Sequence, residues 1–76
     1  MARAFATVDA ATGMAEEVCR TARGTEGVVE AHVIAGDFDV MIELEGEDTH
    51  DILRTITTTI RPHEGVGATR TYVCLD

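Results

Sequence analysis

Several residue types are missing from this sequence, and their absence limits what it can do. It has no lysine, no serine and no tryptophan, and its six basic residues are all arginines, set against fourteen acids for a formal net charge of −8. A surface this negative repels phosphate backbones, so we expect no direct binding of nucleic acid. Without serine, a Ser/His/Asp catalytic group cannot form.

Long apolar runs and targeting signals are missing as well. No run approaches the roughly 18 apolar residues of a membrane span, and Met1 is not followed by a charged and then apolar signal segment. We therefore expect a cytoplasmic protein that neither enters the membrane nor is secreted. The acids are spread along the whole chain among many threonines, alanines and glycines, a composition that suits halophilic, archaeal-type proteins in very high salt.

Residues that carry catalysis or bind metals are few and poorly spaced. His32, His50 and His63 have no acid at a diagnostic spacing, and phosphate-binding glycine loops are absent. Cys19 and Cys74 form no CxxC pair, so two buried thiols are favoured over a disulfide or a metal site. We expect no enzyme, no catalytic residue, no metal and no cofactor.

The hydrophobic pattern predicts four strands and two helices in one domain, residues 1–76. Strands alternate apolar and polar residues, whereas helices carry an apolar stripe and start at capping residues, Thr12 for the first and Asp48 for the second. Met14, Ala15, Val18, Cys19 and Ala22 form the first stripe, and Ile52, Leu53, Ile56 and Ile60 the second. The predicted elements are strand 3–9, helix 12–23, strand 28–35, strand 38–45, a helix ending before Pro62 and strand 66–75.

The two halves of the chain repeat each other at an interval of 38 residues. The segment Glu26-Gly27-Val28 recurs as Glu64-Gly65-Val66, and the apolar stripe of the first helix recurs in the second. Each half is therefore a strand, a helix and a strand. Two such units interleaved in one four-stranded antiparallel sheet form the ferredoxin-like βαββαβ fold, of the α+β class, with both helices on one sheet face.

The other sheet face has nothing in the chain to cover it. The alternation places large apolar residues there, and an uncovered apolar face calls for a partner. A second copy packed face to face would give a homodimer, as a dimeric α/β sandwich or barrel. The residues expected on this open face are Phe5, His32, Ile34, Met41 and Tyr72.

A turn at the centre of the chain, Gly36-Asp37-Phe38-Asp39, carries two carboxylates between two apolar runs. One acid suffices for turn geometry. Asp37 and Asp39 could hold an ammonium group, and backbone amides near Gly36 a carboxylate, which together are the two ends of an α-amino acid. Solvation of a surface turn is the other interpretation, and the residues alone favour it.

Three segments together resemble the ligand-binding (RAM) domain of the Lrp/AsnC, or feast/famine, transcription regulators. They are Gly27-Val28-Val29-Glu30, the turn Gly36-Asp37-Phe38-Asp39, and Glu64-Gly65-Val66 followed by Thr69-Arg70-Thr71-Tyr72-Val73. The resemblance covers nearly the whole chain. It implies dimers joined through their sheets, rings of dimers that are often octamers, and an amino-acid effector bound between dimers near the central turn.

The resemblance also implies which residues bind the effector. Gly36, Asp37, Phe38 and Asp39 would form the effector turn, and Val33, Thr69, Thr71, Tyr72 and Val73 would border the response site. Alternation places Thr69 and Thr71 on the side of Val73, toward the helices, where they could equally be small core residues. We expect Asp39→Ala to abolish effector binding and to leave the fold intact.

One feature departs from the family. Full-length Lrp/AsnC regulators carry an N-terminal helix-turn-helix, whereas here Met1 stands just before the first strand, so we expect a stand-alone module that acts through full-length Lrp/AsnC-type partners. Three alternatives stay open: an ACT-like domain that pairs sheets edge to edge, a ligand-free structural oligomer, and a small dimeric α/β-barrel enzyme. The sequence names neither the amino acid nor the ring size.

Overall fold

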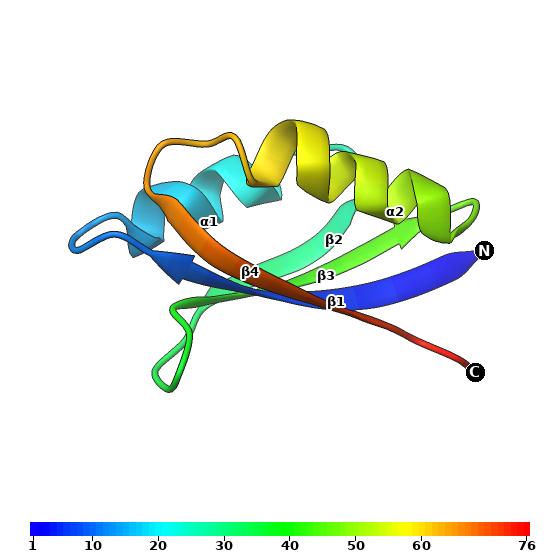
Figure 1. Cartoon of the computed structure of the whole chain (residues 1–76), viewed down its shortest axis with the longest axis horizontal. Helices are drawn as coiled ribbons and strands as arrows, with labels where there is room; N and C mark the ends of the chain where they lie inside the picture. The colour runs from blue at the N-terminus through cyan, green and yellow to red at the C-terminus, as the bar shows by residue number, and fades with distance from the viewer.

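A four-stranded antiparallel sheet covered on one face by two helices makes up the protein (Figure 1). The computed structural model describes all 76 residues. The elements are β1 (Ala2–Ala10), α1 (Ala15–Arg23), β2 (Val28–Val33), β3 (Val40–Gly46), α2 (Thr49–Thr55), its π-helical continuation η1 (Ile56–Ile60) and β4 (Val66–Val73). The sheet order is β2-β3-β1-β4, which confirms the ferredoxin-like βαββαβ prediction.

The core lies between the sheet and the helices, and strand alternation creates it. Along β1, Ala4, Ala6 and Val8 are buried while the residues between them face the other side. Small residues on this central strand let both helices approach the sheet closely. The buried core consists of Ala4, Ala6, Val8, Val18, Cys19, Ala22, Ala31, Val40, Ile42, Leu44, Ile52, Ile56 and Ile60.

The repeat predicted from the sequence has a backbone counterpart at two glycines. Gly27 and Gly65 lie just before β2 and β4 with φ of 96° and 95°, a conformation that glycine adopts far more readily than other residues. Both carbonyls accept a backbone hydrogen bond at 2.8 Å, Gly27 from Glu45 and Gly65 from Ala11. Both halves of the fold therefore turn from the helix into the following strand in the same way.

The helices differ from the predicted ones at two positions, Thr12 and Leu53, and agree with them at Asp48. Thr12 does not cap α1, because the helix begins at Ala15 and Met14 occupies the cap position without a side-chain hydrogen bond. Asp48 does cap α2, since its Oδ1 accepts the Asp51 amide at 2.9 Å. Leu53 was expected in the apolar stripe but is 44% exposed, because the sheet covers only the row of Ile52 and Ile56.

Three strand ends were placed wrongly. β2 ends at Val33 and β3 begins at Val40, so the reversal is a six-residue loop, residues 34–39, instead of a tight turn. Ile34 lies in that loop, half-buried, and not on the strand. β4 ends at Val73, which leaves Cys74 outside the strand and half-buried; only Cys19 is a buried thiol.

The two chain ends lie together, at the opposite end of the sheet from the β2–β3 loop (Figure 1). The Cys74 amide donates to the Arg3 carbonyl at 2.9 Å, so the last residues run beside the start of β1. The loop itself projects from the side away from the helices. Neither helix has the length and apolar character needed to cross a membrane.

Candidate functional site

The sheet face away from the helices is open and mixes aromatic with charged side chains. Phe5 pairs with Tyr72 across β1 and β4, and these two residues are 40% and 55% exposed. Arg3 forms an ion pair with Glu43 at 3.3 Å on the same face. The expectation of an uncovered face with large side chains is confirmed for Phe5, His32, Met41 and Tyr72, with more charge around them than the apolar pattern indicated.

Asp39 anchors the β2–β3 loop to the end of β1. Its amide donates to the Val8 carbonyl at 3.0 Å, and its carbonyl accepts the Ile34 amide at 2.8 Å. Its side-chain Oδ2 accepts the Ala10 amide at 2.8 Å. Asp39 is half-buried and held by three bonds, so it is a structural residue of the loop as well as a charged one.

A second acid, Asp9, lies against Asp39. A hydrogen bond with the Asp39 carboxyl, followed by desolvation and by repulsion from the Asp39 charge, raises the pKa of Asp9 above its ordinary value. Gly67 on β4 packs beside this acid, and a Cβ there would lie 3.4 Å from the Asp9 carbonyl oxygen. Two carboxyl groups separated by 30 positions in the chain therefore meet at one corner of the sheet.

Arg70 brings a positive charge to the same side of the sheet. It pairs with Thr7 across β1 and β4, so its side chain shares the open face with Thr7. Its guanidinium lies over the Phe38 ring, 5.7 Å from the centroid, a cation–π distance. The acid pair and this arginine lie near the end of β1 that meets the β2–β3 loop; we call Asp9, Phe38, Asp39 and Arg70 the loop corner.

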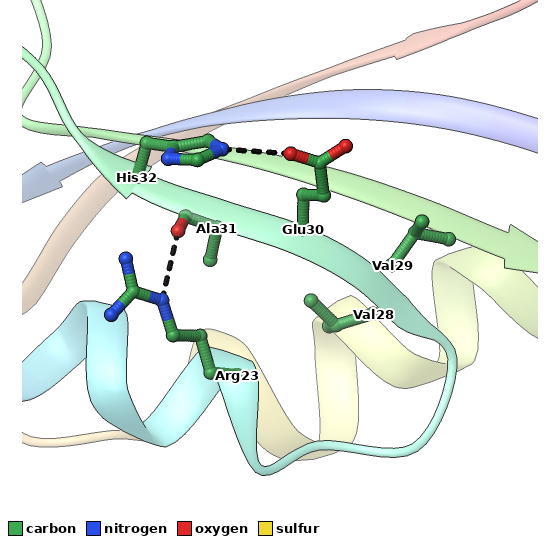
Figure 2. A pocket seen from close by; sticks show the side chains of 6 residues that line it. All are labelled: Arg23, Val28, Val29, Glu30, Ala31 and His32. Carbon is green, nitrogen blue, oxygen red and sulfur yellow. Dashed lines mark hydrogen bonds and ion pairs between the residues drawn. The ribbon is translucent and has the colours of Figure 1, made fainter.

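The two main hollows of the chain lie away from the loop corner. One, of about 270 Å³, follows the outer edge of β2 (Figure 2), and the other, of about 440 Å³, lies near the chain ends. The loop corner is thus an open surface in a single chain. No three His, Cys, Asp or Glu side chains are grouped so as to hold a metal ion.

Among known protein families, residues 3–76 match the model of the Lrp/AsnC ligand binding domain. The chain belongs to this Lrp/AsnC family. A curated relative, the leucine-responsive regulatory protein of Haemophilus influenzae, is 31% identical over 61 residues, which are 80% of this chain and 37% of the relative. The chain spans about a third of the length of the curated relatives it matches.

Solved structures carry the same fold as this Lrp/AsnC domain. A hypothetical protein from Pyrococcus horikoshii superposes with a TM-score of 0.92 at 28% identity, over 100% of this chain and 92% of that one. A transcriptional regulator from Neisseria meningitidis, solved as an L-Met complex, gives a TM-score of 0.85 at 19% identity, over 99% of this chain and 50% of that one.

The predicted site residues of this Lrp/AsnC domain divide between two sheet faces. Phe38 and Asp39 belong to the loop corner, while Gly36 and Asp37 are exposed at the loop tip. Tyr72 faces the open side of the sheet, where it pairs with Phe5, farther from the loop corner than the neighbouring pair of Arg70 and Thr7. The remaining predicted residues, Val33, Thr69, Thr71 and Val73, share the helix side with the core residues of β1 and β3, as the alternation indicated.

Two members of the loop corner were absent from the predicted set. Arg70 lies between two helix-facing threonines, so alternation alone places it on the open face, whereas Asp9 lies at the irregularity of the β1–β4 pairing between Val8 and Ala10. The alternation around Arg70 was available in the sequence. Their meeting with Asp39 was not, because it depends on how the loop folds back onto the end of β1.

Proposed function

We propose that this chain is an amino-acid-binding regulatory module of the Lrp/AsnC type that assembles through its open sheet face. The observation that carries the proposal is the loop corner, where two carboxyl groups and one guanidinium share an open surface. The module itself has a regulatory and not a catalytic role.

The charges of the loop corner complement a zwitterion. The carboxyls of Asp9 and Asp39 suit an ammonium group, and the guanidinium of Arg70 suits a carboxylate, for which arginine offers paired donors. Phe38 lies beside Arg70, and the part of its ring that Arg70 does not cover offers an apolar surface to an effector side chain. An α-amino acid presents these three features together.

The relatives support an amino acid as the effector class. The family is a ligand-binding domain, the Haemophilus relative is named leucine-responsive, and the Neisseria neighbour was solved with L-Met. With a net charge of −8, this chain is poorly suited to contact DNA by itself. We infer that it influences transcription through full-length Lrp/AsnC-type partners.

Assembly would complete the effector site. The two main hollows of the chain lie away from the loop corner, so bound effector needs a further wall, which a neighbouring copy can supply. The exposed Phe5 and Tyr72 on the open face give a homodimer an apolar centre, and Arg3 and Glu43 provide charge around it. We propose dimers joined into a ring, such as an octamer.

The test is calorimetric titration with each of the twenty amino acids, on the unmodified protein and on Asp39→Asn. Asparagine keeps an oxygen that can accept the Ala10 amide and removes the charge, so the loop stays anchored while ammonium binding weakens. We expect at least a tenfold loss of affinity for whichever amino acid binds. Asp39→Ala is less informative, since it also removes the side-chain oxygen that accepts the Ala10 amide and so mixes loss of charge with loss of the loop anchor.

The control is Glu16→Gln, which removes one negative charge from an exposed site on α1. Equal losses in both variants would assign the effect to net charge and not to the loop corner. If no amino acid binds the unmodified protein and Asp39→Asn changes nothing but loop stability, the ligand-free structural oligomer replaces this proposal. The Ala10 bond is the observation that favours that second candidate.

A further inference from the structure

The outer edge of β2 is an unpaired strand edge. β2 is the first strand of the sheet order and has only β3 beside it. The Ile34 amide bonds toward β3 at the Asp39 carbonyl, and backbone groups alternate along an antiparallel strand, so the amides of Ala31 and Val33 face outward. The exposed Val29 and Val33, at 44% and 49%, flank this edge.

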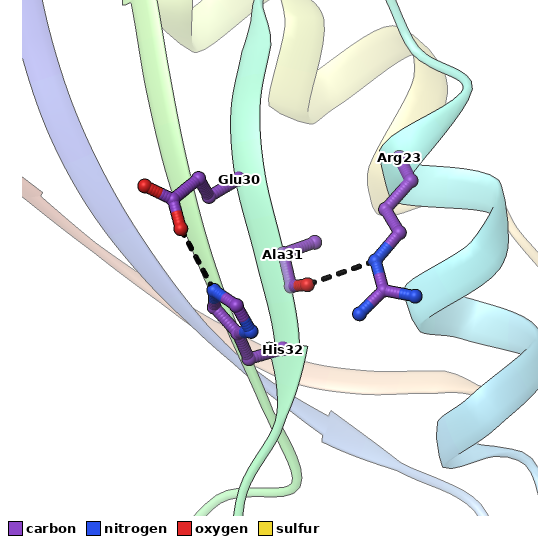
Figure 3. Close-up of polar contacts among 4 residues, drawn as sticks. All are labelled: Arg23, Glu30, Ala31 and His32. Atoms are coloured by element: carbon purple, nitrogen blue, oxygen red, sulfur yellow. Dashed lines mark hydrogen bonds and ion pairs between the residues drawn. The ribbon is translucent and has the colours of Figure 1, made fainter.

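One arginine covers part of the edge. Arg23 of α1 reaches across from the helix side, and its Nε donates to the Ala31 carbonyl at 3.0 Å (Figure 3). This bond confirms that the Ala31 backbone faces away from β3. It occupies one acceptor only, and a carbonyl oxygen accepts two hydrogen bonds, so the edge keeps its capacity to pair with another strand.

We infer that this edge is a second self-pairing surface, on which β2 of another copy lies antiparallel with Ala31 opposite its own counterpart. The occupant is thus a second copy of this chain, held by main-chain hydrogen bonds along β2. The main-chain groups of this surface lie at the strand edge and not on the open sheet face through which the proposed dimer forms, although the Glu30 and His32 side chains project on the open side.

Side-chain charges along the edge select this register. With Ala31 at the two-fold axis, Glu30 of each copy lies opposite His32 of the other, on the open side of the sheet. In a single chain Glu30 and His32 already bond to each other at 3.0 Å, both of them exposed (Figure 3). Pairing would close a four-membered cluster of two carboxylates and two imidazoles around the axis.

The apolar residues fit the same register. The exposed Val33 of each copy falls at the end of the paired segment near Val29 of the other, which lies at the irregularity of the β2–β3 pairing between Val28 and Glu30. Shifting the register by two residues in one direction places Glu30 opposite its own copy, and in the other direction His32 opposite its own copy. Only the central register sets unlike groups against each other.

A chain with two distinct two-fold surfaces forms assemblies larger than a dimer. The open face joins two copies, and the β2 edges of that pair remain to join further pairs, closing a ring or extending a fibre according to the angle between the two axes. The β2 edge therefore provides a physical route from dimers to higher assemblies that does not involve the effector.

Three variants test the inference, with assembly mass measured by sedimentation over a concentration series. Val33→Pro removes an outward amide, which an edge strand tolerates where that amide does not pair within the sheet. His32→Glu places a carboxylate opposite Glu30 of the second copy. The matched control exchanges the two residues, Glu30→His with His32→Glu, and so keeps composition, net charge and complementarity.

We expect Val33→Pro and His32→Glu each to lose one association step, with the mass falling to half or less, while circular dichroism shows a folded chain. The exchanged variant should recover the mass of the unmodified protein. The inference is overturned if both single variants, folded, keep the full mass, or if the exchanged variant stays small. Because the readout is mass without effector, a failure here leaves amino-acid binding at the loop corner as a separate question.

Discussion

Replacing Gly65 by alanine tests whether the turn into β4 depends on both its backbone conformation and the close approach of Met14. Gly65 has a φ of 95°, which L-residues rarely adopt. A Cβ built there would lie 2.8 Å from Met14 Cε and 3.1 Å from Met14 Cβ. The methyl end of Met14 can move aside, whereas its Cβ moves only with the backbone.

The expected loss is the sum of two costs. Forcing a non-glycine residue into a left-handed or similarly strained conformation costs about 1–2 kcal/mol. Overpacking against a fixed neighbour costs about 1–3 kcal/mol more. A domain of this length has a total stability of about 4–11 kcal/mol, so a loss of about 3 kcal/mol removes a large share of it.

Gly27 provides the matched control within the same repeat. Its φ of 96° equals that of Gly65 within a degree, but a Cβ there would meet Thr55 Oγ1 and the Glu45 carbonyl at 3.4 Å, without severe overlap. Gly27→Ala therefore reports the conformational cost alone, about 1–2 kcal/mol. The difference between the two variants isolates the contact with Met14.

The assay is urea unfolding at a fixed protein concentration, since assembly adds to the apparent stability. Gly65→Ala should lose about 1–3 kcal/mol more than Gly27→Ala, and Met14→Gly, which removes the Met14 Cβ, should reduce that difference in the double variant. Equal losses at the two glycines would refute the Met14 part of the reasoning. Losses below about 0.5 kcal/mol at both would refute the backbone part.

Two further predictions concern single acids. The folded-state pKa of Asp9 is raised, so its contribution to stability is present below the ordinary value of 3.8 and is lost as the pH rises through the folded value. Asp9→Asn should therefore unfold at a higher urea concentration than the unmodified protein at pH 7, and this difference should disappear in acid. A difference that stays the same in acid would contradict the role of the acid pair. Asp48→Ala should cost about 0.5–2 kcal/mol in the same assay because the Asp51 amide loses its acceptor, whereas an unchanged midpoint would show that water replaces this cap.

The sequence predicted the fold because its signals were redundant. The alternation of β1, the paired helix stripes and the recurrence of Glu-Gly-Val at Gly27 and Gly65 all indicate the same two interleaved units. Asp48 was identified as a cap because the capping side chain and the helix it starts lie within one turn. Features of this kind depend on near neighbours in the chain and are visible without the structure.

Features that depend on distant segments could not be predicted. Phe38 and Asp39 were assigned to a strand by their apolar and alternating context, yet β3 begins only at Val40, and Asp39 holds the loop against β1 through the bond of its amide to the Val8 carbonyl. Leu53 fits the helical stripe, but how far the sheet reaches under α2 decides its exposure. The acid pair of Asp9 and Asp39 likewise forms only once the loop meets β1.

The closeness of the two chain ends and the repeat of the halves together make the order of the segments interchangeable. Joining residue 76 to Met1 by a short linker and cutting the exposed loop at Gly36 would leave every strand pairing in place. The new chain would run β3, α2, β4, β1, α1 and β2. It would still read strand, helix, strand, strand, helix, strand, so a second linear order of the same segments specifies the same topology.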